Sequence, residues 1–467
     1  MRKEKYIILL FIVAIGQVLY AQNFHTGYFL DGYMYKYRIN PAIANDRTFA
    51  GLAVHSVNIG EAGNYGVNSL IFPLNGGYVT GFNKGIPAEQ FIGGLKPFNN
   101  LRADVSEGIL AFGIWKDSLQ YHNFEINLRT HVSSSLPRDL FAFLKAGTNG
   151  ETYDLAKTHV GASAYVEAAY GYSRKINDMF RVGGRVKALV GIANADLEMK
   201  KATITISNDQ LHVMTNAHIA SSANMLSFPI DDEGYFSLSP EFTSNFKPSG
   251  FGAAVDLGVS ITPVKGLEIN VSMLDLGGIF WNYNSRATSN METIYKGLDN
   301  IAINANIGNT IEEEFNEVLD LLTDVIKFKE DKPLPYKDGF KMMSFAVHGG
   351  ARYQMPFYKG LVVGAAGMYQ YDPFIPHYDV RAGLTLTPHW VFSMTANIGY
   401  STYGLVSGAA LCLNAPAFNL YVGVDNFVGT YGKINGVTVP VSNYATTLQV
   451  GLTIVFGGTL PKDLHKN

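Results

Sequence analysis

Long stretches in which apolar and polar residues alternate recur from about residue 48 to the end of the chain, and this pattern constrains the fold more than any other feature. A two-residue period is typical of a β-strand whose two faces meet different surroundings. The stretches cover about ten residues or more, whereas strands of globular proteins commonly have about five or six. In one stretch aromatic residues stand at both ends of the apolar face, as at the interfaces of membrane barrels. That face carries Trp390, Phe392, Met394, Ala396, Ile398 and Tyr400. The pattern therefore favours strands that span a membrane.

The segments that join these stretches alternate between short and long. The short junctions are 116–120, 173–178, 262–266, 354–360, 387–389 and 414–418. The long ones are 133–159, 193–249, 283–340 and 429–441, and 401–403 is a short junction on their side. A membrane barrel has tight turns on one side and longer loops on the other. A soluble sandwich has no reason to keep this order over so many crossings.

We predict an all-β fold, a closed antiparallel transmembrane β-barrel of about 14 strands (14–16). Backbone groups in lipid must be paired within the protein, so a sheet crosses the bilayer only when it closes on itself. The segments 67–74 and 76–82 are either two short strands or part of an inward-folded segment. An amphipathic helix is expected from Thr310 in the long extracellular loop 283–340, and a shorter helix after Pro137. A soluble sandwich or propeller is the alternative.

The N-terminus has the three parts of a secretory signal peptide. Basic residues precede an apolar run that is shorter than the roughly 20 residues of a membrane span, and Ala21 stands at the expected cut. An uncleaved anchor helix is the alternative. We expect the chain to be exported. Its expected parts are the signal peptide (1–21), an N-terminal plug segment (22–47), the barrel (48–457) and a C-terminal tail (458–467).

Charge, cysteine content and motifs exclude several classes of function. The formal net charge is −3 and no Lys/Arg cluster is present, so nucleic-acid binding is not expected. The single cysteine, Cys412, excludes an internal disulfide and paired-cysteine metal sites, and it is interpreted as a small packing residue. No catalytic or metal-binding motif is recognised, so we predict no enzyme, no cofactor and no metal site.

Charged residues of both signs fall on the polar faces of the predicted strands. Such an interior is typical of a cross-linked lumen that fixes the strand register and holds a plug, rather than of an ion filter of one sign. The tyrosine-rich N-terminal segment is the candidate plug, and Asn40, Pro41 and Ala42 would form the turn that leads to the wall. The predicted lumen residues are Glu125, Arg129, His131, Glu167, Arg185, Lys187, Asp256, Glu268, His348, Arg352, Arg381 and Asp425.

Three kinds of motif resemble known outer-membrane barrels. The stretch YRINPAIAND, with Asn40, Pro41 and Ala42, resembles the NPA stretch near the start of FadL-type long-chain fatty-acid transporters. The stretches AAVDLGVSI, SMLDLGGIFW and LYVGVDNFVG resemble glycine-flanked Asp motifs of the same barrels. The last strand resembles the C-terminal β-signal read by the outer-membrane assembly machinery, at Gln449, Gly451, Ile454 and Phe456. Together they resemble a domain-of-unknown-function family of Bacteroidetes outer-membrane barrels related to FadL-type transporters and PorV-like barrels.

The resemblance implies a Gram-negative outer-membrane barrel with an N-terminal segment inside, but no particular substrate. One hypothesis is passive transport of small hydrophobic or amphipathic molecules, which are then the expected ligands. The alternative is an accessory or scaffold barrel with a partner in protein secretion or surface assembly. An outer-membrane enzyme would need a nucleophile and base placed together, and neither G-x-S-x-G nor H-E-x-x-H occurs. Outer-membrane lipid and the assembly machinery are the other expected partners.

Overall fold

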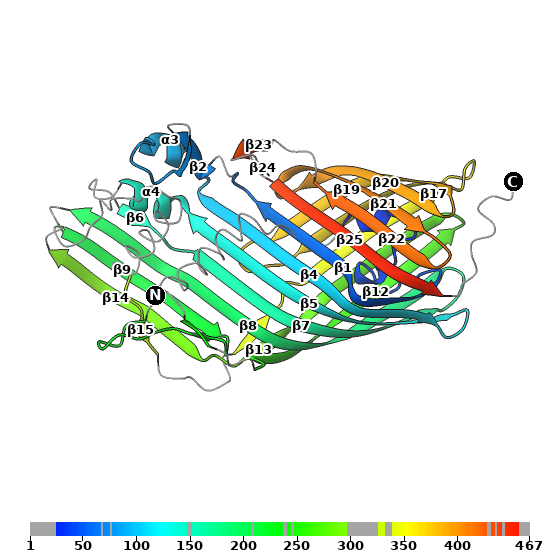
Figure 1. Cartoon of the computed structure of the whole chain (residues 1–467), viewed down its shortest axis with the longest axis horizontal. Coiled ribbons are helices and arrows are strands. Elements are labelled where there is room, and N and C mark those ends of the chain that lie inside the picture. Colours follow the sequence, from blue (N-terminus) through cyan, green and yellow to red (C-terminus); the bar gives the residue numbers. More distant parts are fainter. Residues whose placement is uncertain are drawn as a thin grey trace.

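A closed ring of fourteen antiparallel strands forms the body of the molecule, which Figure 1 shows as a computed structural model of the chain. The structure describes residues 25–66, 69–74, 77–146, 152–207, 210–236, 241–243, 247–296, 326–331, 339–426, 431–434, 437–440 and 444–456. Around the ring, the strands are β1 (Thr48–Gly63), β4 (Phe98–Trp115), β5 (Gln120–Pro137), β7 (Thr158–Lys175), β8 (Phe180–Ser207), β12 (Gly250–Val264), β13 (Leu267–Trp281), β17 (Ala346–Gln354), β18 (Leu361–Gln370), β19 (His377–His389), β20 (Phe392–Ser401), β21 (Gly404–Asn414), β22 (Phe418–Asp425) and β25 (Tyr444–Phe456). β25 pairs with β1 and closes the ring. The predicted barrel of about 14 strands is confirmed.

The other described elements precede the ring or belong to its connections. The N-terminal segment contains a short helix, α2 (Thr26–Phe29), and a 3-10 turn, η1 (Lys36–Arg38). The connections contain the helices α3 (Ala88–Gly93) and α4 (Arg138–Ala146), and α4 confirms the helix predicted after Pro137. Their strands are β2 (Ile71–Leu74), β3 (Gly77–Thr80), β6 (Thr152–Asp154), β9 (Gln210–Ser222), β10 (Leu226–Ser227), β11 (Glu241–Phe242), β14 (Ser285–Lys296), β15 (Lys329–Glu330), β16 (Phe340–Met342), β23 (Tyr431–Ile434) and β24 (Val437–Pro440).

The outer face of the ring is apolar and the inner face is polar. In β20, Ile398 is 58% exposed on the outside, while its neighbour Asn397 is 7% exposed. In β25, Leu452 is 55% exposed and Gln449 is 1% exposed. An apolar wall around a closed ring is matched to lipid, because water would leave a large apolar area unfavourably exposed. The ring is therefore a membrane-spanning barrel, as the alternation predicts.

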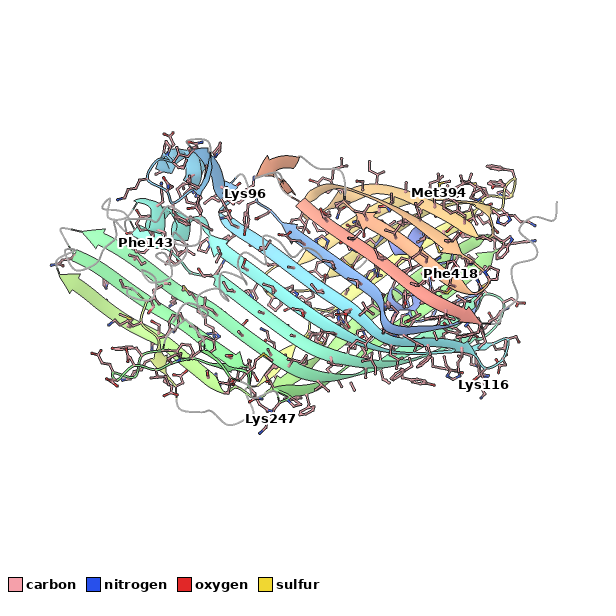
Figure 2. The ribbon with its side chains drawn as sticks, in the orientation of Figure 1. Lys96, Lys116, Phe143, Lys247, Met394 and Phe418 are labelled. Carbon is pink, nitrogen blue, oxygen red and sulfur yellow. The ribbon has the colours of Figure 1, made fainter. Side chains whose placement is uncertain are left out.

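The short connections gather at one end of the barrel, which we call the turn end. The turns there are 116–119, 176–179, 265–266, 355–360, 390–391 and 415–417. Thr48 pairs with Phe456, so the ring begins and ends at the turn end too. Lys116 marks the turn end in Figure 2, and Phe143 lies toward the opposite, far end. The connections at the opposite end are mostly longer, but 371–376 and 402–403 are as short as the turns, so the predicted alternation holds for most of the chain and not for all of it. No helix among the described residues is long and apolar enough to cross a membrane.

At the far end, the predicted long loops 133–159, 193–249 and 283–340 prove to contain strands, which corrects their assignment as loops. β8 is 28 residues long and continues beyond the ring, where it pairs with β9, and β9 pairs with β14. Figure 1 shows this extension of the wall in green. Outside a bilayer neither face of a strand has to be apolar, and Lys200 and Lys201 interrupt the alternation there. Sequence periodicity therefore does not reveal these strands.

The far end also carries a lobe with its own apolar core. Aromatic residues of α3, α4 and the neighbouring loops, among them Phe82, Phe91, Phe141 and Phe143, pack with apolar residues of β8 and β9. The two ambiguous segments 67–74 and 76–82 contribute β2 and β3, which pair with each other and not with the ring. The predicted signal peptide, the C-terminal tail and the helix from Thr310 lie outside the described residues.

Candidate functional site in the lumen

The N-terminal segment, residues 25–47, lies inside the barrel in the half nearest the turn end (Figure 1). Most of it has no regular secondary structure, so its backbone carbonyls need partners other than their own chain neighbours. Polar side chains of the wall supply them. Thr385 donates to the carbonyl of Phe29 (2.6 Å), Ser393 to Asp31 (2.6 Å), Asn419 to Gly32 (2.9 Å) and Ser272 to Ile39 (2.6 Å). The segment is thereby fixed to both sides of the lumen.

Asn40, Pro41 and Ala42 form a turn that rests on the wall. The backbone N–H of Ile43 donates to the carbonyl of Asn40 (2.9 Å), and Asn40 Oδ1 accepts from the backbone N–H of Ala42 (2.8 Å). The amide of Asn40 donates to the carbonyls of Val259 and Val271 on β12 and β13 (3.0 and 3.2 Å). The turn therefore has side-chain contacts both to itself and to the sheet. It lies against β8, β12 and β13, six residues before the first strand begins.

Two glycines make room for this turn. Gly183 on β8 and Gly258 on β12 are paired across the two strands, and both face the lumen. A Cβ atom at Gly183 would collide with the backbone of Pro41 and Ala42, and one at Gly258 would collide with the Asn40 side chain. The wall therefore has a shallow depression at these two positions, because neither glycine has a side chain to fill it.

An aromatic layer lies between the N-terminal segment and the wall. Tyr33, Tyr35 and Tyr37 of the segment pack edge-on or tilted against one another, and Phe49 and Tyr421 of the wall complete the layer. All five side chains are at most 3% exposed. Their rings form a tightly packed apolar floor that closes this half of the lumen.

The wall beside the aromatic layer is irregular. Five residues of β1 (51–55) separate Ala50 from Ser56, whereas only two residues separate their partners on β25. This bulge has Ala53 at φ 55° and turns His55 inward, where it hydrogen-bonds to Tyr35 (2.5 Å). The outward residues Leu52 and Val54 are 57% and 60% exposed. A bulge leaves residues without ladder partners, so β1 and β25 are held together less strongly here than elsewhere.

Charged residues meet in one buried group beside the segment, which we call the charged cluster. Lys187 Nζ lies 2.9 Å from Asp256 and 2.5 Å from Asp275, and Arg185 bridges Glu125 and Asp256. The complete cluster is Arg38, Glu125, Arg129, Glu167, Arg185, Lys187, Asp256 and Asp275. Its four cations match its four carboxylates. Buried charges require such pairing, and a balanced cluster is unsuited to selecting ions of one sign.

The other predicted lumen residues also face inward, but they belong to separate groups. They are His131, which bonds Asp104 (2.6 Å); Glu268, which accepts from Ser260 (3.0 Å); Arg352, which pairs with Asp31; Arg381 and Asp425, which pair with each other (2.6 Å); and His348, which stacks near His25. The structure thus brings six of the twelve predicted residues into the charged cluster and distributes the other six along the lumen.

Sequence reasoning missed Arg38, Asp275 and Asp379. Asp275 has φ 60° and follows the buried Leu274, so two successive residues of β13 face inward and strict alternation fails. The glycines that follow it in SMLDLGGIFW were the only local signal. Arg38 belongs to a segment without strand periodicity, and its partner Glu125 is 87 residues away. Asp379 shares the inward face of β19 with Arg381 and follows directly from the alternation.

Lys36 lies in the N-terminal segment and is 9% exposed. Its ammonium group is 3.8 Å from Asp31, and Arg352 binds the same carboxylate. Burial, followed by repulsion from Arg352, lowers the pKa of Lys36 from its ordinary 10.5 to about 8, although Asp31 opposes the shift. The docked segment therefore favours loss of this proton at mildly alkaline pH.

The four residues of the predicted assembly signal lie in β25. Gln449 faces inward and accepts a hydrogen bond from Tyr33 (2.9 Å), and Gly451 leaves room for the ring of Tyr421. Ile454 and Phe456 face outward and are 46% and 50% exposed. The role in assembly remains a prediction.

Comparisons with known proteins connect the chain to one family and give distant matches to solved structures. The model of a family described as "Family of unknown function (DUF5723)" matches residues 41–425. No curated protein matches the chain. Among solved structures, the Pseudomonas putida toluene transporter TodX is 8% identical with a TM-score of 0.41, over 90% of this chain and 94% of that one. The Ralstonia pickettii toluene transporter TbuX is 8% identical with a TM-score of 0.43, over 90% and 92%. A Pseudomonas aeruginosa FadL homologue is 11% identical with a TM-score of 0.33, over 89% and 92%.

Proposed function

Because the chain belongs to the family of unknown function DUF5723, we propose a function from the barrel itself: passive passage of small hydrophobic or amphipathic molecules across the outer membrane. The observation that carries this proposal is the bulge in β1. It weakens the ladder to β25 in the wall of the barrel, with apolar residues outside and the aromatic layer inside. A hydrophobic molecule can cross such a boundary between lumen and bilayer without entering water.

Passage requires the N-terminal segment to move. The cavity beside the segment, bordered by Tyr28, Asn40 and Asn270, has a volume of about 20 Å³, which holds roughly one water molecule. The segment is held by separate hydrogen bonds, each of which contributes about 0.5–1.5 kcal/mol net. The docked segment is thus the closed state of the proposed path, and its displacement from the aromatic layer is the opening step.

A disulfide can test whether this movement is needed. The ideal Cβ position of Gly32 in the segment is 3.1 Å from the Sγ of Cys412 on β21, so Gly32→Cys places two thiols within bonding reach. Gly32 has φ 75°, so the substitution costs about 1 kcal/mol of backbone strain. Cys412 is the only natural cysteine, so the unsubstituted chain under the same oxidant is a matched control.

We would measure uptake of radiolabelled oleate by a Gram-negative host that lacks its own fatty-acid barrel. Cells with the full-length chain are expected to take up more oleate than cells without it. Oxidised Gly32→Cys is expected to lose this gain, and a reductant is expected to restore it in the same cells. Uptake that persists after the disulfide has formed, or no gain with the unsubstituted chain, would overturn the proposal.

The lobe at the far end favours a second candidate, an accessory barrel that holds a partner protein. Its apolar core is independent of the lumen, and a path for small molecules does not require a folded lobe of this size. A stoichiometric partner in detergent-solubilised native membranes, retained by oxidised Gly32→Cys, would support this candidate. Oleate uptake without a partner would support the first.

A further inference from the structure

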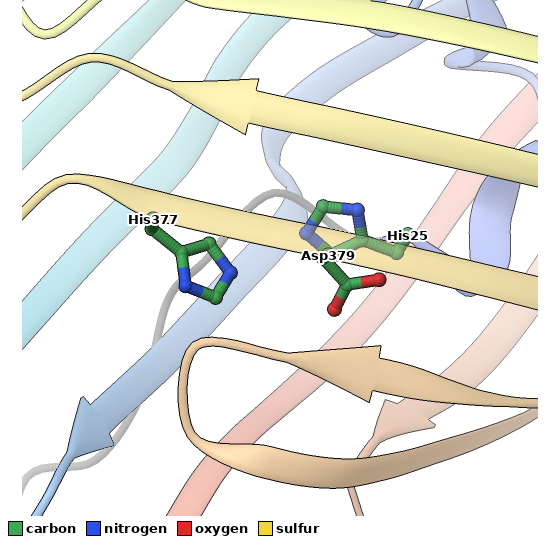
Figure 3. A group of neighbouring side chains, drawn as sticks. All are labelled: His25, His377 and Asp379. Carbon is green, nitrogen blue, oxygen red and sulfur yellow. The ribbon is translucent and has the colours of Figure 1, made fainter.

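Two histidines and one aspartate meet at the wall of the lumen, away from the charged cluster. Figure 3 shows His25 of the N-terminal segment beside His377 and Asp379 of β19. His377 and Asp379 are two positions apart on one strand, so both side chains face the lumen. One nitrogen or oxygen of each of the three residues lies within 4.8 Å of the others. The segment and the wall therefore contribute to one group of potential metal ligands.

Three of the four imidazole nitrogens of this group are buried and have no hydrogen-bond partner among the described residues. His377 is 1% exposed, and neither of its ring nitrogens has a hydrogen-bond partner among the described residues. Nε2 of His25 is likewise inaccessible to solvent and unpartnered within the described part of the chain. Buried polar atoms in native proteins nearly always have a partner, and each exception calls for an explanation. A bound ion would take one nitrogen from each histidine, which accounts for Nε2 of His25 and for one of the two nitrogens of His377.

The surroundings of Asp379 suit a cation. Arg381 binds both carboxylate oxygens of Asp379 (2.7 and 2.8 Å) and also pairs with Asp425. Two carboxylates therefore face one guanidinium, which leaves one negative charge beside the histidines. Arg381 fixes the orientation of Asp379, as partners of ligating carboxylates generally do. The cavity of about 20 Å³ borders His25 and Asp379 and has room for one coordinated water.

We propose that His25, His377 and Asp379 bind a divalent transition metal of the Zn²⁺ class, which fastens the N-terminal segment to β19. Two imidazoles and a carboxylate are ligands that Zn²⁺ and its neighbours prefer, whereas Ca²⁺ and Mg²⁺ require oxygen ligands. Metal bonds of about 2.0–2.2 Å require the three side chains to close in by small rotations. The metal acts as a clip between segment and wall, so this inference stands whether or not the barrel transports anything.

The first test is direct binding to the untagged full-length chain, refolded in detergent. Co²⁺ is the probe because its visible absorption reports coordination by nitrogen and oxygen ligands, and Zn²⁺ should displace it. We expect about one ion per chain. His377→Gln should weaken binding by about 100-fold or more, because even loss of a partner of a ligand costs about 10–100-fold.

His159→Gln is the matched control. His159 is a buried lumen histidine that lies 3.8 Å from Asp196, but no second histidine joins this pair among the described residues. Binding by this variant should equal that of the unsubstituted chain. The mobility of unheated and heated protein in a gel verifies that each barrel has folded. If His377→Gln fails to fold, His25→Gln replaces it, because His25 lies outside the wall.

The second test measures whether the metal ion holds the N-terminal segment against the wall. Cys412 is 1% exposed and lies under Gly32 of the segment, so its reaction with a thiol reagent reports displacement of the segment. Zn²⁺ should slow this reaction about tenfold or more in the unsubstituted chain and leave His377→Gln unchanged. Absence of Co²⁺ binding, equal binding by His377→Gln, or equal labelling of Cys412 with and without Zn²⁺ would each overturn the proposal.

Discussion

Single residues decide how the N-terminal segment docks, and Gly183 and Gly258 are the smallest of them. Their missing side chains create the depression for the Asn40–Pro41 turn. Gly184 is the next residue of the same strand, but a Cβ atom there would meet only ordinary van der Waals contacts, the nearest at 3.5 Å. The two neighbours therefore differ in one respect, namely whether they face the turn.

We expect Gly183→Ala to loosen the segment and Gly184→Ala to leave it in place. The added methyl group meets backbone atoms, which cannot rotate away, and such overpacking typically costs about 1–3 kcal/mol. The docking equilibrium should shift by about 10- to 100-fold, measured as faster labelling of Cys412. Equal labelling rates in the two variants would show that the turn does not rest on Gly183.

The pH dependence of docking should follow Lys36. Its pKa is about 8 in the docked segment and should return toward 10.5 when the segment is displaced. Between these values the displaced segment binds the proton that the docked segment has released, so docking strengthens as pH rises. Labelling of Cys412 from pH 8 to 9.5, each value divided by that of urea-unfolded protein at the same pH, should fall by about tenfold per pH unit at most.

Lys36→Met removes the titrating group and should make the corrected labelling rate independent of pH in this range. A pH dependence that survives in Lys36→Met would assign the effect to another group. The unsubstituted chain would contradict the prediction if its corrected labelling rate rose with pH.

At the scale of strands and helices, the strands of the barrel were predictable from the sequence wherever their outer face contacts lipid. Lipid requires an apolar outer face, so Ile398, Tyr400 and Leu452 stand at their period-two positions. Outside the bilayer the prediction failed: the outer half of β8 pairs with β9, and its apolar side chains pack in the core of the lobe, so no apolar outer face is required there. Bulges are likewise hidden, because the inward turn of His55 and of Asp275 depends on an inserted residue rather than on composition.

The candidate site was predictable in most of its residues but not in its connections. Inward positions follow from the alternation, and all twelve predicted lumen residues face inward. Which charges pair depends on strand neighbours far apart in sequence, as for Lys187 and Asp275. The partners on the N-terminal segment, Asp31 and Arg38, have no periodicity to place them.

The last strand makes an element-scale prediction about assembly. Phe456 is the terminal outward aromatic of β25, and Phe418 faces outward on the neighbouring β22, near the same end, with 39% exposure. If β25 is read by the assembly machinery, Phe456→Ala should lower the amount of folded barrel in the outer membrane severalfold. Phe418→Ala removes a similar lipid contact and should change it little. Immunoblots of unheated outer-membrane samples measure both, and equal losses would indicate lipid anchoring instead.

At the scale of the whole molecule, the barrel and its contents form a closed unit. Deleting residues 22–45 removes most of the segment and the aromatic layer's three tyrosines from the lumen. The polar inner wall then faces a water-filled space, so the refolded barrel should conduct ions in planar bilayers, while the full-length chain should conduct far less. Oxidised Gly32→Cys is the closed reference. Identical conductance with and without the segment would show that it does not block the lumen.

The length of β8 carries part of the sheet well beyond the membrane. Twenty-eight residues at about 3.3 Å each extend roughly 90 Å, and a strand tilted by about 45° rises roughly 65 Å along the membrane normal. A hydrocarbon layer of about 30 Å accounts for less than half of that rise. The rest of the sheet therefore extends roughly 35 Å beyond the acyl chains. If the far end lies on the predicted extracellular side, antibodies and phages would meet β8, β9 and β14 before they reach the membrane.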